Sequence, residues 1–134
     1  MRSRLITLAA AATAAAALGL PATQAHAIGT GTSACGYDVC LSTTNNSATL
    51  YLDRWAGAEW QVCDDASDGM RAKATVSYAG QTLNLQTTGG YGACSSSQSF
   101  YPSPSSGDVI SYRVWVQDGA NGSARYARSG SYTW

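Results

Sequence analysis

The chain has 134 residues, of which 45% are hydrophobic and 12% are charged, and its formal net charge is zero. This length accommodates a single domain. The only histidine is His26, which lies in the apolar N-terminal region. Everything after that region lacks histidine, which excludes Ser-His-Asp and Cys-His nucleophilic sites and histidine-based zinc sites there.

The first 27 residues have the pattern of a secretory signal peptide. They begin with two arginines, continue with an uncharged apolar run over 5–20, and end in the small-x-small cleavage motif Ala-His-Ala at 25–27. The apolar run is shorter than the roughly 20 residues that a membrane span needs. We therefore expect 1–27 to be cleaved and the product, starting at Ile28, to be secreted and extracellular.

The 107 residues after position 27 carry six basic and eight acidic side chains, a net charge of −2. Nucleic acids and anionic membranes select basic proteins, so we predict neither as a partner. The acidic segment DDASDG over 64–69 has Thr75, not glutamate, at the twelfth position of a calcium loop, which favours a solvated turn. We predict no catalytic residues, no metal and no cofactor.

Four cysteines follow the signal region, namely Cys35, Cys40, Cys63 and Cys94. An even number in a short exported chain indicates disulfides, which stabilise a domain with a small core. Three pairings are possible. The spacing favours Cys35 with Cys40 around a short loop and Cys63 with Cys94 across a long one. The main alternative joins Cys40 to Cys63 and Cys35 to Cys94.

Apolar and polar residues alternate with period two, and no long stretch has the 3.6-residue period of an amphipathic helix. We predict strands over 48–54, 60–63, 71–78, 81–86, 97–101, 109–117, 124–129 and, at an edge, 132–134. A two-residue turn at Ala79-Gly80 is expected to join the strands at 71–78 and 81–86 into a hairpin. The pattern predicts an all-β fold, a small antiparallel β-sandwich of six to seven strands with two disulfides, as a single domain over 35–134. The polar segment 28–34 is expected to be a flexible N-terminal arm.

The predicted domain contains all four tryptophans of the chain. We expect Trp60 in the core, whereas Trp55, Trp115 and Trp134 are compatible with either core or solvent. Exposed aromatic and arginine side chains mark protein or sugar contacts. The predicted partner-binding residues are Ile28, Gly29, Thr30, Gly31 and Thr32 of the arm together with Arg54, Trp55 and Trp115.

The expected N-terminus begins Ile28-Gly29. Trypsin-like proteases become active when a new terminus of the Ile-x-Gly type inserts and its ammonium group pairs with a buried carboxylate. A free arm of this kind is suited to act in trans on a toxin or protease-like partner, or to add a strand to a partner's sheet. The alternative is an ordinary disordered terminus.

Short stretches resemble the small secreted α-amylase inhibitors of actinomycetes, the tendamistat type. They are TLY at 49–51 with RW at 54–55 and Cys63, ATVSY at 74–78, and ARYAR at 124–128. The resemblance spans 40–128 and implies a six-stranded Greek-key sandwich with two disulfides that inhibits through an exposed Trp-Arg-Tyr turn. In this chain Arg54, Trp55 and Ala56 occupy the positions of that triplet, Cys35 is additional, and no cysteine follows Arg128.

Together these features predict a non-enzymatic, secreted protein-binding module. It is expected to act as an adaptor or subunit of a secreted assembly, or as an inhibitor. An α-amylase or other hydrolase inhibitor of the tendamistat type is one alternative, and a carbohydrate-binding module that uses exposed aromatic residues is a second. An enzyme that relies on carboxylates alone has the least support.

Overall fold

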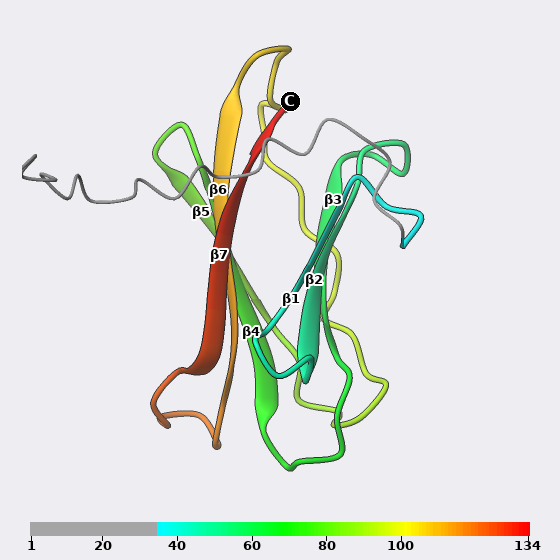
Figure 1. Cartoon of the computed structure of the whole chain (residues 1–134). Coiled ribbons are helices and arrows are strands. Elements are labelled where there is room, and N and C mark those ends of the chain that lie inside the picture. The colour runs from blue at the N-terminus through cyan, green and yellow to red at the C-terminus, as the bar shows by residue number, and fades with distance from the viewer. Residues whose placement is uncertain (1–34) are drawn as a thin grey trace, which may run out of the picture.

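The computed structural model describes residues 35–134, which form seven strands in two facing antiparallel sheets and contain no helix (Figure 1). The three-stranded sheet, in the order β1-β2-β3, consists of β1 Val39–Ser42, β2 Ala48–Asp53 and β3 Glu59–Asp64. The four-stranded sheet, in the order β5-β4-β6-β7, consists of β4 Arg71–Tyr78, β5 Gln81–Gln86, β6 Val109–Gln117 and β7 Arg125–Thr133. The predicted all-β sandwich is confirmed.

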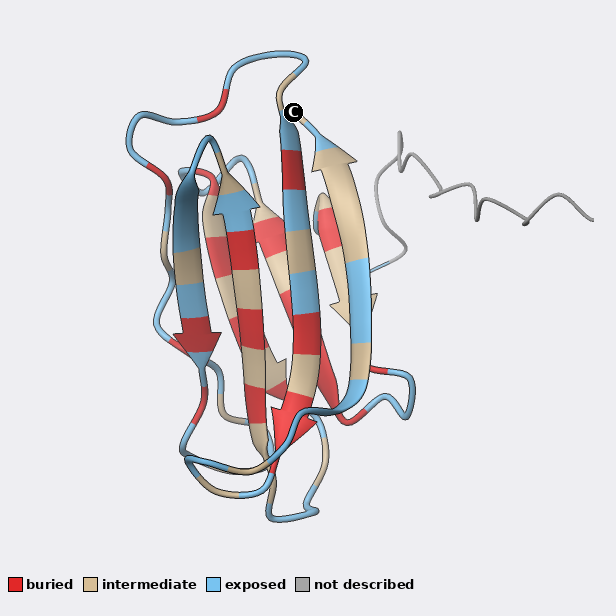
Figure 2. Ribbon diagram, turned by 90° about the vertical axis from the view of Figure 1, so that its left-hand side faces the viewer, coloured by how far each residue is buried: buried red, intermediate tan, exposed pale blue. Residues whose placement is uncertain are grey.

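The core lies between the sheets and is filled by alternate residues of each strand. Figure 2 looks onto the four-stranded sheet, where buried positions alternate with more exposed ones along β4 and β6. Leu50 and Leu52 of β2 and Ile110 of β6 are fully buried. Trp60 is also fully buried, as predicted, and its ring lies 5.5 Å from that of Tyr112. The period-two pattern of the sequence is therefore the pattern of the core.

The strands differ from the sequence prediction in three places. Residues 39–42 form β1, which pairs with β2. The sequence predicts no strand there and only a tight loop before Cys40. The predicted strand at 97–101 is wrong, because only Gln98 pairs with β3, through a single bridge to Trp60. The predicted segments 124–129 and 132–134 are one continuous strand, β7, because it pairs with β6 along most of its length.

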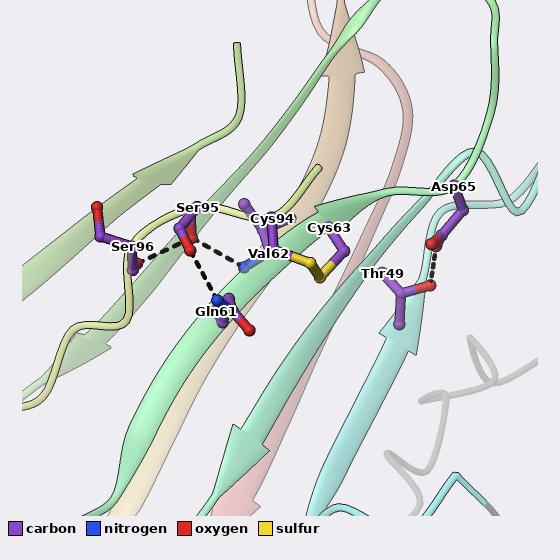
Figure 3. Close-up of a disulfide and its surroundings, with 8 residues drawn as sticks. All are labelled: Thr49, Gln61, Val62, Cys63, Asp65, Cys94, Ser95 and Ser96. Atoms are coloured by element: carbon purple, nitrogen blue, oxygen red, sulfur yellow. Dashed lines mark hydrogen bonds between the residues drawn. A yellow bond between two sulfur atoms is a disulfide. The ribbon is translucent and has the colours of Figure 1, made fainter. Parts of the chain in front are cut away.

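Both disulfides have the pairing that the spacing favours, Cys35–Cys40 and Cys63–Cys94. Figure 3 shows that the second joins β3 to the long segment 87–108 between β5 and β6. Ser95 extends this contact: its Oγ accepts from the Val62 N–H at 3.1 Å, and its carbonyl accepts from Gln61 Nε2 at 2.7 Å. Two disulfides are consistent with an extracellular protein.

The two sheets differ in charge. Five of the six basic residues within 35–134 lie in strands of the four-stranded sheet, which contain no acidic residue: Arg71, Lys73, Arg113, Arg125 and Arg128. The strands of the three-stranded sheet contain Asp53, Glu59 and Asp64 and no basic residue. The sandwich therefore has a basic sheet and an acidic sheet, although the described residues together carry a small net negative charge.

The two disulfides should contribute unequally to stability. Cys63 and Cys94 are separated by 31 positions, whereas Cys35 and Cys40 are separated by 5. In the chain-entropy model, loss of the longer crosslink lowers the free energy of unfolding by about 3.7 kcal/mol and loss of the shorter one by about 2 kcal/mol. Urea unfolding of the double variants C63A/C94A and C35A/C40A measures the difference. Equal losses would contradict the entropic origin of the effect.

Candidate functional site

The most exposed aromatic side chains gather at one end of the sandwich. Trp55, in the β2–β3 turn, is 94% exposed, and Tyr101, in the segment between β5 and β6, is 92% exposed. Ser99 Oγ donates to the Gly57 carbonyl at 3.2 Å, which holds the segment leading to Tyr101 against the turn. Figure 1 places the β2–β3 turn and the C-terminus at this same end. We call Arg54, Trp55, Tyr101 and Trp134 the aromatic end.

The backbone of the β2–β3 turn is held by two aspartates. Asp53 Oδ1 accepts from the backbone N–H groups of Trp55 and Ala56, each at 3.0 Å, so Asp53 forms an Asx turn. Asp38 is the residue before β1, and its Oδ2 accepts from the Arg54 N–H at 2.9 Å. Gly57 follows with a φ of 98°, a conformation that glycine adopts without strain. Trp55 is therefore exposed on a turn with an ordered backbone.

Arg54 links this turn to the opposite sheet. Its Nη1 donates to the Tyr132 hydroxyl at 3.1 Å, and its Cζ lies 4.7 Å from the centroid of the Trp134 ring. Tyr132 and Trp134 contact each other edge to face, with ring centroids 6.2 Å apart. A guanidinium over an indole face is attracted by the ring quadrupole. The predicted contact residue Arg54 thus lies beside Trp55 and fixes the C-terminal aromatic residues.

Asp108 fastens the loop that carries Tyr101. Its Oδ2 accepts from the Tyr78 hydroxyl at 2.6 Å and from the Ser105 N–H at 2.7 Å, and its carbonyl accepts from the Trp134 N–H at 2.8 Å. The bond from Tyr78, followed by that from Ser105, lowers the pKa of the Asp108 carboxyl. The same bond, with some burial, raises the pKa of Tyr78. The loop end and the C-terminus therefore share one anchor.

The acidic segment 64–69 lies at the other end of β3 and differs in part from the predicted solvated turn. Asp65 and Asp68 are exposed, but Asp64 is only 2% exposed. Its Oδ1 accepts from the Ala66 N–H at 3.1 Å, whereas Oδ2 has no partner within 35–134. Burial raises the pKa of Asp64, and the charges of Asp68 and Asp65 add to the effect. Across the described residues, no three His, Cys, Asp or Glu side chains are grouped to hold a metal.

The structure brings together only part of the predicted contact set. Arg54 and Trp55 are neighbours in the turn, but Trp115 is half-buried on the outer face of β6, on a different surface. The arm residues 28–32 and the signal region 1–27 lie outside the described residues. The predicted contact set lacks two residues of the aromatic end: Trp134, for which the sequence allows core or solvent, and Tyr101. The proline-rich stretch that begins at Pro102 is the signal in the sequence that indicates a loop, and not a strand, at Tyr101.

Comparisons with known proteins returned no relative. No protein-family model, no curated protein and no solved structure matches this chain. Between residues 35 and 134 there is no helix long and apolar enough to cross a membrane.

The bond between Tyr78 and Asp108 should make stability depend on pH. A lowered pKa in the folded state adds stability above the unfolded value of about 3.9, and this stability is lost as the pH falls through the folded pKa. D108N should therefore unfold more easily at pH 7 and lose less stability on acidification than the parent protein. Y78F should reproduce part of both effects. Thermal unfolding from pH 7 to pH 2 measures them.

Asp64 supplies a control of opposite sign. Because its folded pKa is raised, its ionisation destabilises the fold above that pKa, and the cost disappears as the pH falls. In the parent protein Asp64 makes stability fall as the pH rises, and D64N should abolish this fall. Asp108 makes stability rise with pH, and D108N should abolish that rise. Slopes that changed in the same direction in both variants would contradict these assignments.

Proposed function

We propose that this chain is a secreted, non-catalytic protein-binding module that inserts its β2–β3 turn into a concave site of another protein and acts as an inhibitor. The observation that carries the proposal is Trp55, 94% exposed on a turn held by Asp53 and Asp38. Tryptophan combines a large apolar surface with a polar N–H group, and this combination is enriched at protein interfaces.

The energetics of binding favour this turn as the anchor. Interface hot spots are enriched in tryptophan and arginine, and each typically contributes about 2 kcal/mol or more. Asp53 already orders the turn backbone, and Tyr132 and Trp134 already order the Arg54 side chain, so less entropy is lost on association. Tyr101 adds a second exposed ring at the same end.

The form of the surface favours an inhibitor or adaptor over an enzyme. Trp55 and Tyr101 are almost fully exposed, whereas catalytic side chains typically line concave pockets with convergent polar groups. Residues 28–134 also lack histidine, the most frequent general acid and base. Within this class, a projecting turn fits the cleft of a partner, which is the arrangement of an inhibitor.

Inhibition of α-amylase is the particular activity that the resemblance implies, and one feature of this chain supports it. Arg54 and Trp55 are adjacent in an exposed turn between paired strands, although the Trp-Arg-Tyr triplet itself is absent and its first two residue types stand here in the reverse order. Ala56 stands where the third residue of the triplet would be tyrosine. Tyr101, attached to the turn through Ser99 and Gly57, places a phenol at the same end from another segment. We propose it as the substitute.

The test is an inhibition assay of purified protein against a panel of secreted α-amylases and other glycosidases and proteases. Inhibition of at least one enzyme is expected, and W55A should weaken it by about 30-fold, the equivalent of about 2 kcal/mol. Y91A is the matched control, because Tyr91 is 71% exposed but lies near Asp64 at the opposite end. If Y91A weakened inhibition as much as W55A, the aromatic end would not be the contact.

Asp53 should act on binding by positioning Trp55. D53A removes the acceptor for two turn N–H groups and should weaken inhibition by about tenfold, mainly through faster dissociation. D53N keeps a side-chain oxygen that can form the same Asx turn, so it should restore most of the affinity. Surface plasmon resonance of both variants on the target enzyme measures this. Equal affinities for D53A and the parent would show that the turn needs no ordering.

A further inference from the structure

The outer face of the four-stranded sheet, turned toward the viewer in Figure 2, is built from rows of polar side chains. The strand register aligns one hydroxyl row across all four strands: Thr82, Ser77, Ser111 and Ser131. The next row consists of Asn84, Thr75, Arg113 and Ser129. The third contains Gln86, Lys73 and Trp115. With strands about 4.8 Å apart, such a face is about 14 Å wide.

Two adjoining hollows occupy this face. The larger, of about 540 Å³, lies over β4, β6 and β7 and is lined mainly by serine and threonine with Arg113. The smaller, of about 310 Å³, lies over β4, β5 and β6, and its polar lining is Lys73, Asn84 and Gln86 beside Trp115. Thr75, in the larger hollow, pairs with Asn84 of the smaller one, so the two are continuous across the sheet.

The charge of this face is positive and unpaired. Arg71, Lys73 and Arg113 are its cations, and none of them has an ion pair or side-chain hydrogen bond to any residue of 35–134. The strands of this sheet contain no carboxylate. This face therefore combines three cations that lack counter-charges with many hydroxyl groups. Such a surface is complementary to an anion that also carries many hydrogen-bonding groups.

Trp115 is held in place on this face. Its Nε1 donates to Gln117 Oε1 at 3.2 Å, and Gln117 Nε2 in turn donates to the carbonyls of Gly119 and Ala120 at 3.1 and 2.7 Å. On its other side, Arg113 Cζ lies 5.4 Å from the centroid of the indole. An indole fixed in this way offers an apolar surface between polar rows, which suits the C–H face of a sugar ring.

We infer that the outer face of the four-stranded sheet binds an acidic polysaccharide. The hydroxyl and amide rows exchange hydrogen bonds with sugar hydroxyls, Trp115 packs against a ring face, and Arg113 with Lys73 pairs with carboxylate or sulfate groups. A nucleic acid fits less well, because phosphate contacts dominate such interfaces and this face has more neutral hydroxyls than cations. The site is separate from the aromatic end and goes beyond the proposed inhibition.

The experiment compares acidic polymers with their neutral counterparts. Protein purified from a secreting host is titrated calorimetrically with polygalacturonate and with its fully methyl-esterified form, and with dextran sulfate and dextran. Binding to at least one acidic polymer, and about tenfold or weaker binding to its neutral counterpart, is expected, with affinity falling as salt rises. The two acidic polymers distinguish a carboxylate-bearing ligand from a sulfate-bearing one.

Variants locate the site. R113Q and W115A should each weaken binding to the acidic polymer by about tenfold. R128Q should leave it within twofold, because Arg128 is exposed on the same sheet but lines neither hollow. W55A should also leave it unchanged, so that failure of this proposal and failure of the inhibitor proposal can be told apart. R113Q changes an exposed residue and keeps the test valid if W115A fails to fold.

Three results would overturn the inference. The first is the absence of binding to both acidic polymers. The second is equal affinity for a single-stranded oligonucleotide of matched charge, which would make the face a general polyanion binder. The third is equal loss in R128Q and R113Q, which would place the effect in the net charge of the sheet and not in the hollows.

Discussion

The attachment of segment 87–108 to the edge of β3 is the constraint that ties the two sheets together and on which the aromatic end depends. This segment leaves β5 and returns to β6 of the same sheet, but on the way it runs along the other sheet. Trp60 and Gln98 exchange two backbone hydrogen bonds of 2.8 and 3.0 Å, and the Cys63–Cys94 disulfide closes the path. An edge strand that would otherwise expose unpaired backbone groups is thereby covered, and the two sheets are tied together.

The same attachment determines where the functional side chains lie. Because Gln98 is fixed to β3, Ser99 lies against Gly57 of the β2–β3 turn, and Tyr101 follows two residues later at the same end of the sandwich. The segment then ends at Asp108, which holds both Tyr78 of the basic sheet and the C-terminal backbone. The aromatic end is therefore assembled from three parts of the chain that are distant in sequence, and its order derives from packing and hydrogen bonds at its base.

Local signals in the sequence were sufficient for the sandwich and for three strands of its four-stranded sheet. The predicted ranges 71–78, 81–86 and 109–117 coincide with β4, β5 and β6, because each has one face in the core and so alternates clearly. β1 was missed because it has only four residues and only Val39 among them is fully buried, which leaves no alternation to detect. Segment 97–101 has strand-like composition, but its pairing is set by β3, a tertiary effect.

The site was less predictable than the fold because it, too, depends on tertiary contacts. The sequence placed Trp60 in the core but left Trp55 open between core and solvent, because the exposure of Trp55 arises from the Asx turn at Asp53. The contact of Arg54 with Trp134 joins residues 80 positions apart. Sequence identified Arg54 and Trp55 as candidates from residue type, but only the fold separates them from Trp115 and adds Tyr101.

The separation of charge between the sheets gives the two proposed surfaces a fixed relation. The proposed acidic polymer would be attracted by Arg71, Lys73 and Arg113 and repelled by Asp53 and Glu59 on the other sheet, which favours approach from the basic side. In that orientation the aromatic end lies at the rim of the sandwich, beside the polymer and not beneath it. A module bound to an acidic matrix would therefore keep Trp55 accessible to a partner, and no conformational change is needed for both contacts to exist at once.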